Sequence, residues 1–83
     1  MAHIIPPKYL EAFPDAKLAK YKTFIPNTNK QPKRWKDANY IYEWDYQHGT
    51  VEKYNRNGKH LGEYNPLTGE KLKPADLKRT IEP

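Results

Sequence analysis

Three residues near the middle of this 83-residue chain combine the groups needed for proton transfer. Asp45 and Glu52 lie on either side of a His48-Gly49 step, so two carboxylates and an imidazole fall within one short segment. When carboxylates lie close together the pKa of one of them rises, and a carboxylate beside an imidazole holds the ring in one tautomer. Such groups can remove the proton from a ribose 2′-hydroxyl and protonate the departing 5′ oxygen. These residue types therefore predict cleavage of RNA by general acid–base catalysis.

The same residues also have a purely structural interpretation. A half-solvated hairpin ordinarily carries Glu, Gln, Thr and Arg on its exposed face, and histidine at a turn is unexceptional. The chain has no cysteine, which excludes disulfides and thiolate chemistry, and His3, His48 and His60 lack the spacing of metal ligands. We therefore expect no metal and no cofactor, and we expect His60 to be a structural hydrogen-bonding residue.

A change to strand-like sequence at residue 40 predicts the element that carries these groups. Aromatic residues alternate with mostly polar ones over residues 40–47, which is the period of a β-strand. If His48-Gly49 forms a two-residue hairpin loop, Asp45 lies directly opposite Glu52 and Glu43 lies opposite Tyr54. Like charges at such a pair destabilise a sheet, so a sequence selected only for folding would tend to avoid them. The other face of the hairpin is expected to form the core, with Tyr42, Trp44, Tyr46 and Val51.

Turn sequences divide the rest of the C-terminal half into short segments. Asn57-Gly58 and residues 65–69 have the composition of tight turns. The runs between them have strand length, and they predict a meander of antiparallel strands. The strands expected after the first hairpin turn cover residues 50–56, 59–64, 70–73 and 77–81.

The N-terminal third predicts looser structure. Residues 1–39 contain five of the eight prolines, and Pro14 limits any helix within residues 8–20 to one or two turns. Residues 23–36 have no hydrophobic period and are expected to form an extended connector. The expected fold is mainly β within the α+β class: a small, strongly twisted antiparallel sheet formed by residues 40–83, preceded by a basic, proline-rich arm with a short helical segment. Arm and sheet form one compact domain.

The basic charge is concentrated in the arm. The chain has a formal net charge of +5; residues 1–39 contain eight basic and three acidic side chains, whereas residues 40–83 contain seven of each. Such a surface indicates either a polyanionic partner, such as nucleic acid or an acidic protein, or simply a solubilising surface. No apolar run is long enough to span a bilayer. The candidate RNA-binding residues are Lys33, Arg34 and Lys36 of the arm and Tyr54 and Arg56 of the sheet.

Two motifs in the C-terminal half resemble a known family. Residues 42–52 read YEWD-x-QHG-x-x-E, residues 60–69 read HLG-x-YNP-x-TG, and Lys78-Arg79 follows near the end. Together with Arg34-Trp35, this pattern is similar to the C-terminal cytotoxic ribonuclease domain of the ribosome-inactivating colicins and cloacin. The resemblance implies cleavage of 16S ribosomal RNA near its 3′ end, in the decoding centre, which stops translation.

The resemblance also implies which residues are catalytic. Carried over position by position, it assigns the family's catalytic residues to Asp45, His48, Glu52 and Arg79. In the assignment we favour, Glu52 is the general base and His48 the general acid, although the two roles could be exchanged. Asp45 would orient and stabilise the charge of His48, and Arg79 would neutralise the phosphate.

Partners and setting follow from the resemblance as expectations. The substrate would be 16S RNA within the small ribosomal subunit, and an acidic immunity protein would protect the producing cell. The chain is expected to be a monomeric toxin domain of a larger bacterial toxin, secreted or delivered from the cell surface, that acts in the cytoplasm of the target bacterium. A colicin-like bacteriocin is one possible parent, and the divergent N-terminal part favours the other, a contact-dependent growth inhibition protein. The alternatives are a non-catalytic RNA-binding module that uses the aromatic row and the arm, and a toxin that cleaves tRNA or other RNA.

Overall fold

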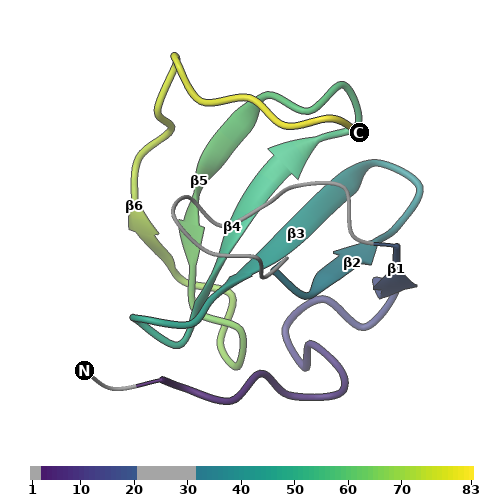
Figure 1. Ribbon diagram of the computed structural model, residues 1–83, viewed down its shortest axis with the longest axis vertical. Coiled ribbons are helices and arrows are strands. Elements are labelled where there is room, and N and C mark those ends of the chain that lie inside the picture. Colours follow the sequence, from purple (N-terminus) through teal and green to yellow (C-terminus); the bar gives the residue numbers. More distant parts are fainter. Residues whose placement is uncertain (1–2, 21–31) are drawn as a thin grey trace.

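The computed structural model describes residues 3–20 and 32–83, which form one six-stranded antiparallel sheet. Each strand pairs with the next along the chain, and the strands twist relative to one another across the sheet (Figure 1). The predicted meander is confirmed, and it begins earlier than expected because two strands of the N-terminal part belong to the same sheet. The strands are β1 (Lys17–Ala19), β2 (Arg34–Lys36), β3 (Tyr40–Asp45), β4 (Thr50–Asn55), β5 (His60–Tyr64) and β6 (Lys71–Lys73).

The predicted N-terminal helix is wrong: the described residues contain no helix, and so none long and apolar enough to cross a membrane. Two successive tight turns form instead, in which the Phe13 N–H donates to Leu10 C=O at 3.1 Å and the Ala16 N–H donates to Phe13 C=O at 3.0 Å. A proline in the middle of the segment has no N–H with which to extend a helix. The Ala12 N–H donates to Pro66 C=O at 3.0 Å, so contacts with a distant turn replace local helical bonds.

One face of the sheet carries the apolar core, as the alternation of the sequence predicts. Tyr42, Trp44 and Val51 are buried, and the partly buried Tyr46 packs against them. β2 adds Trp35, whose ring centroid lies 6.3 Å from that of Trp44 in an edge-to-face arrangement. The N-terminal segment covers this face through Leu10, Phe13 and Ala16.

The β3–β4 hairpin has a longer loop than the sequence suggested. Residues 46–49 connect the strands, and the Gly49 N–H donates to Asp45 C=O at 2.9 Å from a backbone with φ of 69° that favours glycine. The predicted pairing of Asp45 with Glu52 is therefore wrong, because Asp45 lies opposite Thr50 and Glu43 lies opposite Glu52. The register differs from the predicted one by two residues, which leaves each side chain on its predicted face. Asp45 and Glu52 still share one face.

The C-terminal segment does not form the predicted strand at residues 77–81. Residues 74–83 run from β6 back past the ends of β5 and β4, as the yellow trace in Figure 1 shows. One isolated bridge pairs this segment with the sheet in the described part of the chain. A turn prevents longer pairing, because the Arg79 N–H donates to Asp76 C=O at 3.0 Å. The turn brings Arg79 to the face of the sheet opposite the core, the second face, which also carries Glu52.

Candidate active site

The second face of the sheet buries acidic side chains. Glu43 of β3, Glu52 of β4 and Glu63 of β5 are 3%, 6% and 6% exposed and lie opposite one another in register. Asp45 lies on the same face at the end of β3. Burying a carboxylate is costly unless hydrogen bonds or opposite charges compensate for the lost water. This face is therefore unlike the exposed polar surface of an ordinary half-solvated hairpin.

Arg34 is the partner of Glu43. Its Nε and Nη2 donate to Glu43 Oε2 at 3.1 and 2.7 Å, and its Nη1 donates to Glu82 C=O at 2.8 Å. Arg34 is only 1% exposed, so its guanidinium faces the interior and not solvent, although the sequence suggested it as an RNA-binding residue. The physical reason is the buried Glu43, which requires a cation in β2, the neighbouring strand.

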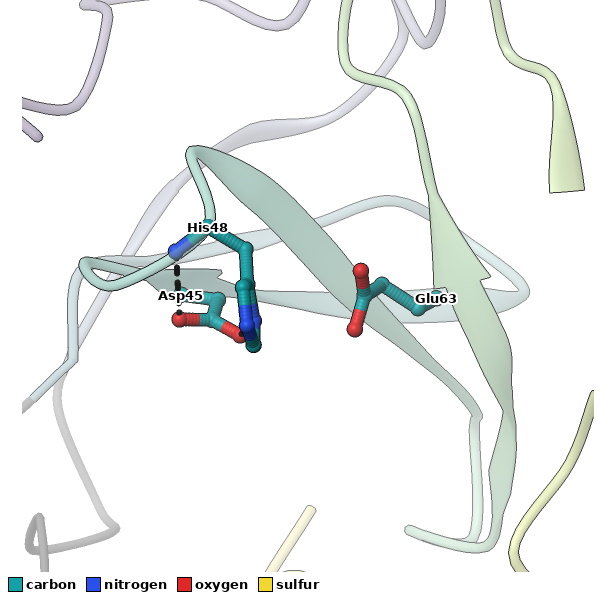
Figure 2. Close-up of side chains that lie close together, drawn as sticks. All are labelled: Asp45, His48 and Glu63. Carbon is teal, nitrogen blue, oxygen red and sulfur yellow. Dashed lines mark hydrogen bonds and ion pairs between the residues drawn. The ribbon is translucent and has the colours of Figure 1, made fainter. Parts of the chain in front are cut away.

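Asp45 and His48 form the first histidine–carboxylate pair of the site, the Asp45–His48 pair. Asp45 Oδ1 accepts the N–H groups of Gln47 and His48, and its Oδ2 lies 2.7 Å from His48 Nδ1 (Figure 2). Burial alone would raise the pKa of Asp45, but these hydrogen bonds and the nearby imidazole hold it below its usual value. The His48 side chain is 45% exposed, so its Nε2 remains available to a substrate.

Glu52 and His60 form the second pair, the Glu52–His60 pair, in the interior. His60 Nε2 lies 2.7 Å from Glu52 Oε1, and the two side chains are only 4% and 8% exposed. His60 Nδ1 accepts the N–H of Asp76 at 2.8 Å, so the proton of the neutral ring lies on Nε2 and is donated to Glu52. The expected structural hydrogen bonds of His60 are present, and their acceptor is a candidate catalytic carboxylate.

Glu63 connects the two pairs. It lies directly opposite Glu52 in the register of β4 and β5, and both side chains are buried. Burial raises the pKa of Glu52 above its usual value, and the neighbouring Glu63 carboxylate adds to this effect. The hydrogen bond from His60 and the charge of Arg79 oppose it in part. Figure 2 shows the Glu63 carboxylate pointing toward the ring of His48.

A metal site can also be considered at this cluster. Ligand-type atoms of Asp45, His48 and Glu63 all lie within 4.8 Å of one another, a set of donors that a divalent cation could accept. However, Asp45 Oδ2 and His48 Nδ1 are bonded to each other at 2.7 Å. The arrangement is therefore also that of a hydrogen-bonded acid–base cluster.

Arg79 supplies positive charge next to Glu52. Its Nη1 lies 3.7 Å from Glu52 Oε1, and its guanidinium lies 5.9 Å from the centre of the Tyr54 ring. The Arg79 side chain is 48% exposed and can therefore reach a bound phosphate. Tyr54 is fully buried, and burial raises the pKa of its hydroxyl far above the usual value. Tyr54 thus packs against the guanidinium of Arg79 and offers no exposed ring on which an RNA base could stack.

The remaining candidate RNA-binding residues are dispersed. Lys33 donates its Nζ to Pro7 C=O at 2.7 Å and lies 5.2 Å from the centre of the Trp35 ring, so it holds the N-terminal segment to β2. Lys36, at the end of β2, and Arg56, in the β4–β5 turn, are both exposed. Residues 23–31 of the predicted connector lie outside the described residues.

Sequence reasoning missed Glu63, although a signal was present. A two-residue loop at Asn57-Gly58 places Glu63 opposite Glu52, which is the observed register. The role of His60 could not be found in this way. An irregularity in the β4–β5 pairing next to Tyr54 moves His60 to the face that carries Glu52, whereas regular alternation would direct it to the core face.

Comparison with known proteins gives a consistent result. The family described as Cytotoxic matches residues 4–82. Colicin E3 from Escherichia coli is 45% identical over 73 residues, covering 78% of this chain and 13% of the colicin. Cloacin from the same species is 40% identical over 84 aligned positions, covering 84% of this chain and 15% of cloacin, and colicin-E6 is 42% identical over 73 residues. The chain thus spans a small part of the length of these relatives.

Proposed function

Because the chain belongs to the Cytotoxic family, we propose that it is an antibacterial toxin domain that cleaves 16S ribosomal RNA near its 3′ end, in the decoding centre, and so blocks translation. The observation that carries the proposal is the grouping of acid, base and cation on one face. Asp45 Oδ2 lies 2.7 Å from His48 Nδ1, and Arg79 Nη1 lies 3.7 Å from Glu52 Oε1. RNA cleavage through the 2′-hydroxyl needs these three functions and no cofactor.

Glu52 is the general base in this mechanism. Its raised pKa makes it a stronger base than an ordinary glutamate, and its carboxylate is held by His60 Nε2 at 2.7 Å. Arg79, adjacent to Glu52, would stabilise the negative charge that builds on the phosphate as the 2′ oxygen attacks. The position of this cation beside Glu52 supports our choice of Glu52 over His48 as the base.

His48 is the general acid. Its Nδ1 is held by Asp45 at 2.7 Å, so its Nε2 is the nitrogen that can deliver a proton to the departing 5′ oxygen. Asp45 fixes the ring orientation and compensates for the positive charge of the doubly protonated imidazole. The exposed position of His48 on the 46–49 loop allows a bulky RNA leaving group to approach.

The RNA backbone would approach from the side of β6 and the C-terminal segment. The exposed cations near the carboxylates are Lys73, whose Nζ lies 3.8 Å from Glu63 Oε1, and Arg79. Lys71 and Lys78, in the same parts of the chain, are also exposed. Arg34 and Lys33 of the arm are engaged in contacts within the protein. Among the described residues, exposed cations beside the candidate catalytic carboxylates therefore include ones from the C-terminal half.

We also propose a cognate acidic immunity protein, because the net charge of +5 favours a partner of opposite charge. Relatives of this chain are much longer, and the chain spans 13% of colicin E3. We infer that a larger secreted or cell-surface-delivered toxin carries this domain into the cytoplasm of the target bacterium. The parent is either a colicin-like bacteriocin or a contact-dependent growth inhibition protein; the expected divergence of the N-terminal part, which favoured the second, is wrong because the family match begins at residue 4.

The test is incubation of intact bacterial ribosomes with the domain in the presence of EDTA. The wild type should release a short 3′ fragment of 16S RNA, and Glu52→Gln and His48→Ala should not. Binding of ribosomes by the wild type without any fragment would indicate a non-catalytic RNA-binding module. Loss of tRNA or other RNA in the same gel, with intact 16S RNA, would indicate a ribonuclease toxin with another target.

A further inference from the structure

Glu63 is a buried carboxyl in the site that the mechanism above does not use. It is 6% exposed, and Glu52, its partner in the strand register, is also 6% exposed. Its carboxylate lies within 4.8 Å of the acid–base atoms of both Asp45 and His48. Two carboxylates that are buried and directly opposite each other in a sheet repel when both are ionised, which favours a state with one proton on the pair.

We propose that Glu63 is a positioning residue of the catalytic site, which shares one proton with Glu52 and thereby sets the pH range in which the base is active. This inference rests on the proposed ribonuclease function and deepens it. Lys73 Nζ lies 3.8 Å from Glu63 Oε1, so the negative charge of the pair has a partner on the Glu63 side. His60 Nε2 binds Glu52 Oε1, which leaves the other Glu52 oxygen for the shared proton.

Other charged groups face this pair, and their effects must be considered. Arg79, at 3.7 Å, favours the ionised form of Glu52, and so does the hydrogen bond from His60. Burial and Glu63 act in the opposite direction, and the pKa of Glu52 is raised overall. Removing the charge of Glu63 should therefore allow Glu52 to ionise at lower pH. The remaining groups on this face are Arg34, Glu43, Asp45, His48, Tyr54 and Lys73.

The first test is the pH dependence of kcat/KM for ribosome cleavage by the wild type and by Glu63→Gln. Glutamine has the same shape and can donate a hydrogen bond to ionised Glu52. The acidic limb of the profile should move to lower pH by about one unit, because a close like charge has been removed. Glu70→Gln, a matched loss of one exposed carboxylate in the β5–β6 turn, should leave the midpoint unchanged.

The outcomes separate the two proposals. Superimposable acidic limbs for the wild type and Glu63→Gln would overturn the role of Glu63 and leave the ribonuclease proposal intact. Absence of cleavage by the wild type at every pH would instead overturn the proposed function.

A second measurement does not depend on any variant. In an NMR titration of the wild-type chain, the side-chain carboxyl carbons of Glu52 and Glu63 should each report both proton-binding steps of a coupled pair. Two independent single-step curves would show that the residues do not share a proton and would overturn the proposal.

Discussion

The two histidine–carboxylate pairs have the same composition and opposite environments. In the Asp45–His48 pair the imidazole is 45% exposed, whereas in the Glu52–His60 pair it is 4% exposed. The folded state lowers the pKa of Asp45 and raises that of Glu52. The same pair of functional groups is therefore accessible to solvent in a loop and buried, with a weakly acidic carboxyl, in the sheet. Whether the pKa of the carboxyl group is lowered or raised depends on how deeply it is buried and on how many backbone N–H groups donate to it.

Among the changes to the two pairs, loss of the proposed general base, Glu52, should reduce the rate of RNA cleavage most. Glu52→Gln retains an acceptor for His60 and a donor for Glu63 but cannot take a proton. We expect cleavage of ribosomes to fall by about 10³-fold, as is typical for loss of a general base. Circular dichroism should show an unchanged fold. Residual cleavage near the wild-type rate would mean that His48 is the base and that the roles of the two pairs are exchanged.

Loss of the exposed imidazole should have a slightly smaller effect. For His48→Ala we expect cleavage to fall by about 10²-fold to 10³-fold, because water can partly replace a solvent-accessible acid. Added imidazole should restore part of the rate, since the side chain leaves an open space at the surface. The same addition should not rescue His60→Ala, whose cavity is buried. Rescue of both variants would remove the distinction between the pairs.

The buried imidazole should matter more for folding than for chemistry. In His60→Ala, Glu52 loses a buried hydrogen-bond donor, and the Asp76 N–H loses its acceptor. We expect the free energy of unfolding to fall by about 2–4 kcal/mol. Urea unfolding followed by tryptophan fluorescence measures this change. Loss of cleavage without loss of stability would contradict the structural role of His60 and would make it a direct participant in catalysis.

Asp45 and Glu52 should change the free energy of unfolding with opposite dependence on pH. Because the fold lowers the pKa of Asp45, its contribution is present above the pKa of an unfolded aspartate, about 3.9, and is lost as pH falls through the folded value. The pKa of Glu52 is raised, so its contribution is complete below about 4.3, the pKa of an unfolded glutamate, and is lost as pH rises through the folded value.

At neutral pH, Asp45→Asn should therefore lower stability by up to about 1 kcal/mol, and Glu52→Gln should raise it by about 1 kcal/mol. Both differences should diminish toward low pH. Urea midpoints measured between pH 3 and pH 8 provide the comparison, with Glu70→Gln as the exposed control. Curves that shift in the same direction for both variants would contradict the opposite pKa shifts.

The sequence was most informative where local rules decide the structure. Alternation over residues 40–47 predicted the core face correctly, because one face of a sheet must exclude water. The loop length could not be predicted, since the Asp45 side chain binds the backbone of residues 47 and 48 and thereby favours a four-residue connection. The prediction of an N-terminal helix failed because Pro14 has no N–H and because the Ala12 N–H donates to Pro66 C=O in a distant turn.

The candidate site was only partly accessible from the sequence. Asp45, His48 and Glu52 were identified from residue type and spacing, and Arg79 required the family resemblance because it lies far from them along the chain. The burial of Glu43, Glu52 and Glu63 could not be read from composition, since their partners come from β2, β5, β6 and the C-terminal segment. Polar residues at alternate positions indicate an exposed face unless those partners are known.

The contact between Asp76 and His60 has a consequence for the order in which the molecule becomes active. A chain made from its N-terminus contains Asp45, His48 and Glu52 before it contains the backbone N–H that fixes the His60 tautomer. Arg79 follows three residues after Asp76. The six strands precede Asp76 and Arg79 in the chain, so a complete site depends on the segment that follows β6.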